Sequence, residues 1–302
     1  MAERVAMACR ASRNLHGAVT GGQHALATVA PVMTTSVSPV ITLDRATRMF
    51  GATRALDAVS ATVHPGQFVA IIGRSGAGKT TLLRCLSRAT SLSAGAIRFG
   101  DTDVAGLGGR TLREHRACVG MIYQQFNLVR RLRVIDNVLI GRLARLSGWA
   151  RWAALARRFD AIDVEAALRC LDHVGLLERV WQRTDTLSGG EQQRVAIAKI
   201  LAQDPRVILG DEPVASLDVL NGRLVMDTLC RIARAAGLTV VATLHHVDYA
   251  RAYADRIFGL RAGRIVFNGA PSELDDARLF EIFGEVPQSL PVADVDVLAR
   301  TA

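Results

Sequence analysis

The feature that most constrains the fold is a glycine-rich stretch in the first third of the chain. Residues 73–80 match the pattern G-x-x-x-x-G-K-[ST] of a loop that binds nucleotide phosphates. The apolar run at 68–72 predicts a strand before this loop, and residues 80–87, with leucines along one side, predict a helix after it. Because strand, loop and helix is the context that this motif requires, an α/β fold built around a nucleotide is expected.

Each part of the loop has a chemical role. Glycines let successive backbone N–H groups turn toward the phosphates, and the following helix adds the positive end of its dipole. Lys79 is expected to reach the β- and γ-phosphates, and the Thr80 hydroxyl is expected to bind the Mg²⁺ that bridges the same oxygens.

A second anion-binding turn lies downstream. Residues 187–194 read Leu-Ser-Gly-Gly-Glu-Gln-Gln-Arg, so Ser188 and two glycines stand at the mouth of a predicted helix. Such a turn is expected to bind a phosphate group, and the loop at 73–80 is expected to hold the nucleotide that carries it. Together the two motifs predict an ATPase that works as a pair of subunits.

Two adjacent acids end an apolar strand predicted at 207–210. Neighbouring carboxylates at a strand end are costly unless a cation shares them, so Asp211 is expected to hold the metal through water. Glu212 is then placed to polarise the attacking water as general base. An apolar run before Asp-Glu is often only a strand end, and the upstream loop is what favours catalysis.

Two polar residues that follow strands are further candidates. Gln124 comes after the strand predicted at 119–123 and could bind Mg²⁺ or orient water, although a lone Gln is typically a surface residue. His245 comes after the strand predicted at 239–244 and could hydrogen-bond the γ-phosphate as a neutral imidazole. A lone His is more often structural, and His246 beside it makes the assignment less specific.

Two more candidates have ordinary alternatives of their own. Asp218, in the run Ser216-Leu217-Asp218, could reach across a dimer interface or could simply cap a helix. Phe50 could form a flat apolar platform for adenine, whereas an isolated Phe more often belongs to the core.

Composition narrows the class of protein without naming a partner. A hydrophobic fraction of 50% can bury a substantial core, and the net charge of +9 is spread along the chain, which is weak evidence for nucleic acid or an anionic membrane. The five cysteines are widely spaced without a C-x-x-C pair, which favours a reducing compartment over disulfides or zinc. No apolar stretch reaches the length of a membrane span, so any membrane role is expected through other subunits.

The two ends of the chain carry no usable periodicity. Residues 1–38 bear arginines and few acids, as transit peptides do, but a disordered leader or a start codon placed too early, with Met33 as the true start, is the preferred interpretation. Residues 285–302 are expected to be a flexible tail.

One domain is predicted between them, at 39–284. Strands alternate with helices, which implies a largely parallel sheet covered on both faces. The section from about 126 to 188 is expected to be mostly helical, residues 100–118 are expected to be a polar connection, and residues 257–260 and 264–267 predict a final hairpin.

The motifs in this order resemble the ATP-binding cassette (ABC) family over nearly all of residues 41–284. The resemblance implies a P-loop NTPase with a RecA-like core, an N-terminal antiparallel β-subdomain and an inserted α-helical subdomain. It also implies head-to-tail homodimers, in which the Ser188 turn of one subunit closes over the γ-phosphate held by Lys79 of the other, with ATP and Mg²⁺ as cofactors. The site residues implied are Glu212, His245 and Gln124 for catalysis; Thr80, Gln124 and Asp211 for metal; and Phe50, Gly73, Arg74, Ser75, Gly76, Ala77, Gly78, Lys79, Thr80, Thr81, Ser188, Gly189, Gly190 and Asp218 for the nucleotide.

A finer resemblance is to the ATPases of phosphonate importers. It rests on residues 124–129, 131–141, 211–218 and 243–250. It implies a peripheral protein at the cytoplasmic face of the inner membrane, bound to transmembrane permease subunits and served indirectly by a periplasmic solute-binding protein. The implied cargo is phosphonate or a near relative such as phosphite.

Several positions stand out within this resemblance. Trp149 and Trp152 lie where those ATPases carry an aromatic insertion, and helix packing and permease contact are equally open for both. Glu191 replaces the usual Gln and adds a negative charge near a triphosphate, which an outward-facing side chain would make harmless. Gly210 replaces a slightly larger residue, and Phe50 replaces the frequent Tyr.

Two other functions stay open. A soluble cassette ATPase acting on DNA would need a long coiled coil between Lys79 and Ser188, for which the sequence has no room, and ribosome-associated versions usually carry two cassettes where this chain has one. Nucleic acid is therefore not an expected partner. An importer of polar amino acids has a similar region around Gln124, and it is the run at 243–250 that favours phosphonate.

Overall fold

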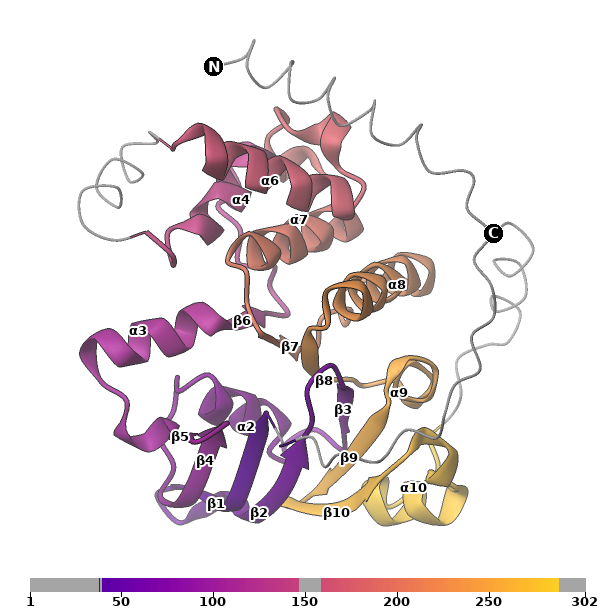
Figure 1. Cartoon of the computed structure of the whole chain (residues 1–302). Coiled ribbons are helices and arrows are strands. Elements are labelled where there is room, and N and C mark those ends of the chain that lie inside the picture. The colour runs from indigo at the N-terminus through magenta and orange to yellow at the C-terminus, as the bar shows by residue number, and fades with distance from the viewer. Residues whose placement is uncertain (1–37, 39, 147–158, 288–302) are drawn as a thin grey trace, which may run out of the picture.

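The computed structural model describes residues 38, 40–146 and 159–287, which form two β-sheets with helices around them (Figure 1). An antiparallel sheet has the strand order β2-β1-β4-β5. The second sheet has the order β10-β9-β3-β8-β7-β6, and only β10 pairs antiparallel. The strands are β1 (Ile41–Phe50), β2 (Thr53–Val63), β3 (Phe68–Ile72), β4 (Ala94–Phe99), β5 (Thr102–Asp103), β6 (Val119–Ile122), β7 (Val207–Asp211), β8 (Thr239–Thr243), β9 (Arg256–Arg261) and β10 (Arg264–Gly269).

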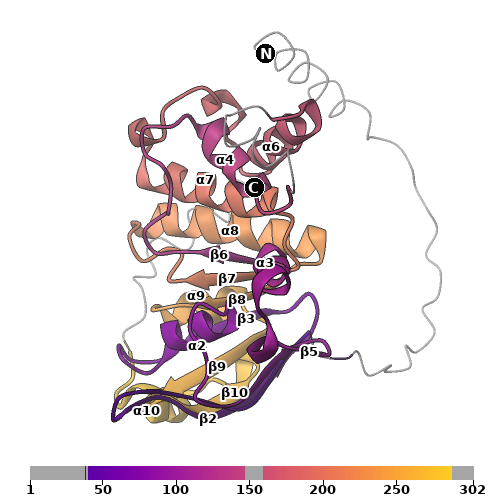
Figure 2. The same cartoon turned by 90° about the vertical axis from the view of Figure 1, so that its left-hand side faces the viewer.

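Helices cover both sheets. They are α2 (Lys79–Leu86), α3 (Gly109–Cys118), α4 (Val134–Arg142), α6 (Ala161–His173), α7 (Gly189–Ala202), α8 (Val219–Ala236), α9 (Val247–Tyr253) and α10 (Asp276–Phe283), with 3-10 turns η1 (Val104–Gly106), η2 (Leu177–Arg179), η3 (Thr184–Thr186) and η4 (Pro271–Glu273). Both views place α4, α6 and α7 at one end of the molecule and the antiparallel sheet at the other (Figures 1 and 2). Within the described ranges, no helix combines the length and apolarity needed to cross a bilayer.

Two cores lie on opposite faces of the six-stranded sheet. β3 is buried at every position, as expected for a central strand covered on both faces. Its alternate residues Val69 and Ile71 join a core shared with α2 and the antiparallel sheet, whereas Phe68, Ala70 and Ile72 join the core shared with α4, α6, α7 and α8. α2 is therefore held between the two sheets, directly after the loop that follows β3.

A fully buried amide anchors the segment that leaves β6. The Asn137 side chain in α4 accepts a hydrogen bond from Val129 N (2.8 Å) and donates to Val129 O (3.1 Å) and Thr184 Oγ1 (2.8 Å). Because a buried amide is costly unless its groups are paired, these bonds specify one arrangement of the segment against α4. The residues after Gln124 are thereby tied to the helical section.

The α/β class, the antiparallel N-terminal sheet and the helical insertion expected from the sequence are confirmed. The final hairpin is also present: β9 and β10 join through Ala262 (φ 50°) and Gly263 (φ 78°), the positive φ values that a two-residue hairpin turn needs.

Other expectations need correction. The connection at 100–118 contains α3, none of whose residues is buried, so no apolar periodicity marks it in the sequence. α8 starts before residue 222 because Asp218 caps it by accepting a hydrogen bond from Asn221 N. The helices α9 and α10 were not expected either. Most of the predicted leader and tail, with Trp149 and Trp152, lies outside the described residues.

Candidate functional site

The phosphate loop is shaped by glycines packed against neighbouring strands. φ is 149° at Gly73, 80° at Gly76 and 104° at Gly78, a region that side chains rarely allow. A Cβ on Gly73 would collide with Leu260 O of β9, and a Cβ on Gly78 would collide with Ala55 O of β2. The loop thus forms a cradle that only glycine fits at these positions.

Lys79 lies inside this cradle as the first residue of α2. It is 5% exposed, and its Nζ donates to Gly73 O (2.8 Å) and Arg74 O (3.1 Å). Burial lowers the pKa of Lys79, while the nearby charges of Glu212 and Asp211 act in the opposite direction. The ammonium is therefore held at the loop, where a phosphate oxygen would compete for the same three protons.

Three oxygen-bearing side chains meet at the ends of α2, β7 and β8. Thr80 Oγ1 donates to Asp211 Oδ1 (2.9 Å), and Thr243 Oγ1 lies 3.2 Å from the same oxygen. The strand register places Asp211 beside Thr243. A hydroxyl and a carboxylate this close together provide the kind of hard oxygen ligands that Mg²⁺ prefers.

Glu212 stands next to this cluster in an unusual backbone conformation. Its φ is 52°, which a non-glycine residue adopts at a cost, and its N–H donates to Thr243 Oγ1 (2.9 Å). His245 Nε2 lies 2.5 Å from Glu212 Oε1, and the two side chains are 45% and 17% exposed. The structure thus brings the predicted base and the predicted His together, with His245 against the carboxylate.

Close packing also surrounds the strand before these acids. A Cβ on Gly210 would come within 3.3 Å of Ala242 Cβ and 3.4 Å of Pro213 Cγ. The glycine therefore suits the tight contact between β7, β8 and the turn after Glu212.

The Ser188 turn opens α7 with a reciprocal cap. Ser188 N donates to Glu191 Oε2 (2.9 Å), and Glu191 N donates to Ser188 Oγ (3.3 Å). The Arg179 Nε lies 3.4 Å from Glu191 Oε1. Hydrogen bonds from Ser188, more than the charges of Arg179 and Arg194, hold the pKa of Glu191 below its usual value. The carboxylate therefore turns back onto its own helix.

The same chain does not bring this turn to Lys79. Cβ atoms built on Gly189 and Gly190 would have Leu217 and Asn221 as their nearest neighbours. Asn221 in turn bonds Asp218, whose pKa is lowered by those hydrogen bonds. Asp218 is thus a helix cap within its own chain, and the first N–H groups of α7 have no acceptor within the helix.

Phe50 is exposed, at 49%, at the end of β1 and is not a core residue. The Arg48 guanidinium stacks on its ring at 4.4 Å from the centroid and is anchored by a 2.8 Å bond to Ser91 O. One face of the ring is thus supported by a cation.

Gln124 is exposed beyond the end of β6, which pairs with β7. It lines a hollow of about 550 Å³ together with Gln192 and Ser216. The segment with Gln124 therefore lies beside both the start of α7 and the turn after Glu212.

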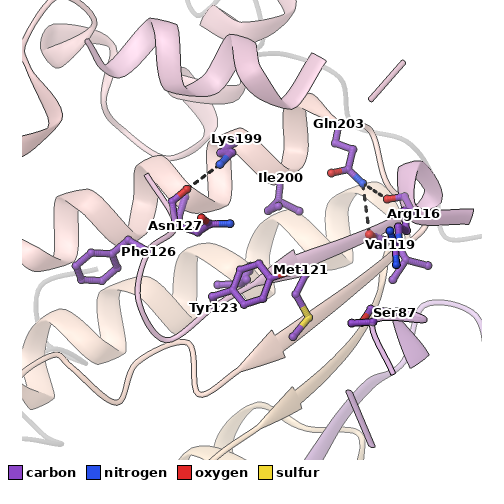
Figure 3. A pocket seen from close by; sticks show the side chains of 13 residues that line it. Ser87, Arg116, Val119, Met121, Tyr123, Phe126, Asn127, Lys199, Ile200 and Gln203 are labelled. Carbon is purple, nitrogen blue, oxygen red and sulfur yellow. Dashed lines mark hydrogen bonds between the residues drawn. The ribbon is translucent and has the colours of Figure 1, made fainter. Parts of the chain in front are cut away.

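A groove of about 430 Å³ lies between β6 and α7, next to the residues that follow Gln124 (Figure 3). Lys199 of α7 donates to Asn127 O (2.8 Å), and Gln203 donates to Arg116 O (2.7 Å). Tyr123, Met121 and Phe126 supply apolar surface (Figure 3). None of the lining residues is acidic, so the groove carries positive charge.

Sequence reasoning missed Thr243, Asn221 and Arg48. Thr243 ends an apolar strand, and only the register with β7 reveals its contact with Asp211. Asn221 and Arg48 match no motif. Arg48 bonds Ser91 O, and Asn221 packs against Gly190 of α7, so both contacts join segments that are far apart in the sequence.

Comparisons with known proteins agree with this geometry. A family model described as ABC transporter matches residues 56–215. The chain is 49% identical over 244 residues to the phosphonates import ATP-binding protein PhnC of Rhodopseudomonas palustris (strain BisB5), covering 81% of this chain and 89% of that protein. It is 47% identical over 244 residues to the protein of the same name from Bradyrhizobium diazoefficiens, covering 81% and 90%.

Solved structures show the same architecture. A dimeric ATP-binding cassette in a post-hydrolysis state, bound to ADP and phosphate, matches with a TM-score of 0.66 and 29% identity, covering 76% of this chain and 98% of that one. The cbiO1 protein from Clostridium perfringens, part of an ABC transporter complex, shares the fold with a TM-score of 0.69 and 24% identity, covering 78% and 90%.

Proposed function

Because this chain belongs to the ABC transporter family, we propose that it is the ATP-hydrolysing subunit of a phosphonate importer, bound peripherally at the cytoplasmic face of the inner membrane. The observation that carries the proposal is the 49% identity over 244 residues with a phosphonate import ATPase, spanning 89% of that protein.

The phosphate loop suits a triphosphate. The cradle has no room for a side chain at Gly73 or Gly78, and the Lys79 ammonium donates to two backbone carbonyls there. Lys79 would neutralise the β- and γ-phosphates, with Arg74, Ser75, Gly76, Ala77 and Thr81 contributing backbone and side-chain donors around them. Phe50, supported by Arg48, would stack on the adenine.

The oxygen cluster suits Mg²⁺. Thr80 and Asp211 would hold the ion, Asp211 through water, with Gln124 approaching from the end of β6. When bound, the ion supplies positive charge that stabilises the transferring phosphoryl group.

Glu212 would accept the proton of the attacking water. Thr243 fixes the backbone at Glu212, and His245 orients the carboxylate through its Nε2. With a nucleotide in the cradle, His245 would exchange this contact for one with the γ-phosphate.

The second half of the site would come from another copy of the chain. The Ser188 turn lies against Leu217 and Asn221 rather than its own phosphate loop, and it presents the glycine N–H groups at the start of α7. In a head-to-tail dimer, Ser188, Gly189, Gly190 and Asp218 of one protomer would close over the nucleotide of its partner.

The groove between β6 and α7 would face the permease. It lies beside Gln124, and it combines the Lys199 and Arg116 cations with apolar side chains. The segment after Gln124 would transmit closure of the dimer to the membrane subunits. A periplasmic solute-binding protein would deliver phosphonate or phosphite to the periplasmic side of those subunits.

Growth and uptake test this function. A strain of the source bacterium lacking this gene should fail to take up labelled methylphosphonate and fail to grow on it, while growing normally on phosphate. Expression of the wild-type gene or of Arg110→Ala, which removes a cationic side chain that is 85% exposed, should restore uptake and growth. Expression of Lys79→Ala should restore neither. Normal phosphonate uptake in the deletion strain, or a selective loss of phosphite or polar amino acid uptake, would exclude phosphonate as cargo.

A further inference from the structure

Gln193 in α7 is buried in a way that stability alone does not explain. It is 0% exposed, and its Nε2 donates to Pro213 O at 2.5 Å. Its Oε1 is buried without a partner among the described residues. Because an unpaired buried amide oxygen destabilises the fold, an apolar residue would be the more stable choice here. The amide is therefore retained for its bond to Pro213.

This bond joins two segments with different tasks. Gln193 lies one turn after the Ser188 cap on the same helix. Pro213 directly follows Glu212, whose backbone has a φ of 52° and is held on its other side by Thr243. A shift of α7 along the bond would therefore move the peptide next to the predicted base.

A second contact joins the same two segments. A Cβ on Gly190 would lie 2.7 Å from Asn221 Oδ1, so the start of α7 packs directly on the Asn221 side chain. Asn221 Nδ2 donates to Asp218 Oδ2 (2.7 Å) in the turn before α8. Gln193 and Asn221 thus connect the Ser188 turn to both ends of the run from Glu212 to Asp218.

We propose that Gln193 and Asn221 are positioning residues that couple the two nucleotide sites of the dimer through each protomer. This rests on the head-to-tail dimer of the proposed function, in which Ser188 serves the partner's nucleotide and Glu212 serves its own. Closure on a phosphate at one site then shifts α7, and the two contacts carry that shift to Glu212 at the other site. Close packing makes such a shift discrete rather than gradual.

Mixed dimers of the full chain, made from two differently tagged copies, measure the coupling directly. One copy carries Lys79→Ala, so only the other copy's nucleotide site turns over. The coupling ratio is the ATPase rate per active site of the wild-type dimer divided by that of the mixed dimer. We expect a ratio of at least about threefold, because the vacant site cannot close on the Ser188 turn of the active copy.

Gln193→Met, introduced into both copies, should bring the coupling ratio close to one. Methionine keeps the length of the side chain and removes both the bond to Pro213 and the unpaired oxygen, so the melting temperature should stay near that of wild type. A second variant, Asn221→Ala, retains the backbone cap of α8 and should lower the ratio as well. Gln203→Met is the matched control, because Gln203 is the C-terminal cap residue of α7 and bonds the carbonyls of Arg116 and Ala117.

The outcomes separate cleanly. A ratio of one in wild type, a ratio unchanged by both Gln193→Met and Asn221→Ala, or an equal loss in Gln203→Met would each overturn the proposal. If the chain forms no ATP-dependent dimer, the coupling proposal also fails, whereas phosphonate uptake by the deletion strain tests the transport function independently. A melting temperature that falls while the ratio holds would assign Gln193 a purely structural role.

Discussion

Thr243→Val tests how the acidic end of β7 is built. Valine keeps the branched shape of threonine, so packing in β8 is preserved while the hydroxyl is removed. In the wild type this fully buried hydroxyl accepts a bond from Glu212 N (2.9 Å) and lies 3.2 Å from Asp211 Oδ1. The variant leaves Glu212 N–H without this acceptor and Asp211 with Thr80 as its remaining hydroxyl partner.

The magnitude follows from that lost acceptor. Leaving a buried donor unsatisfied costs about 1–3 kcal/mol of unfolding free energy. For a domain of this size, about 2 kcal/mol lowers the melting temperature by roughly 4–8 °C. If about 1.4 kcal/mol of the loss appears as misplacement of Glu212 in the transition state, kcat falls about tenfold, with a smaller change in KM.

Thermal denaturation and steady-state ATPase kinetics measure the two effects. Thr228→Val is the matched control, since its buried hydroxyl donates to Leu224 O within α8, far in the chain from the acids. The control should lose about 1 kcal/mol or less and keep its kcat, because the helix still satisfies that carbonyl. If Thr243→Val keeps both the melting temperature and kcat of wild type, Thr243 does not position Glu212.

Three further predictions address other parts of the chain. Glu212→Gln should spare ATP binding and trap a closed dimer, which gel filtration with ATP would detect; wild-type turnover would refute its assignment as base. Hydrogen bonds from Ser188 lower the pKa of Glu191 below 4.5, so the capping carboxylate stabilises the fold fully above that value and loses its effect as pH falls through the folded pKa. The melting-temperature advantage of wild type over Glu191→Gln should therefore shrink steadily as the pH is lowered from 7 through the folded pKa of Glu191. Truncation of residues 1–32 should leave ATPase activity intact, and loss of folding, seen by circular dichroism, would show that the leader belongs to the domain.

Some features follow from short stretches of sequence because their physics is local. Glycines at 73, 76 and 78 are needed where the loop has positive φ, and the short apolar run at 68–72 directly before that loop is typical of a strand buried on both faces. The serine and glutamate at 188 and 191 encode a reciprocal cap within four residues. Local patterns of this kind were sufficient to predict the α/β class, the phosphate loop and the acids after β7.

Other features have no local signal. α3 is an exposed helix, so its sequence has no apolar face by which to recognise it. Arg48 reaches Ser91, and Gln193 reaches Pro213, across gaps in the chain that no spacing rule describes. Each of these contacts depends on the conformation of one side chain and on which distant segment packs beside it.

The sequence by itself determined which groups this protein can offer to a nucleotide, because a phosphate loop, a serine-capped helix start and a pair of acids are each written in consecutive residues. Only the tertiary structure decided how those groups meet. The parallel register of β7 and β8 sets Thr243 beside Asp211, and the packing of α7 near the start of α8 sets the Ser188 turn against Leu217 and Asn221. Strand register and helix packing are long-range properties, so they emerge only when the whole core assembles.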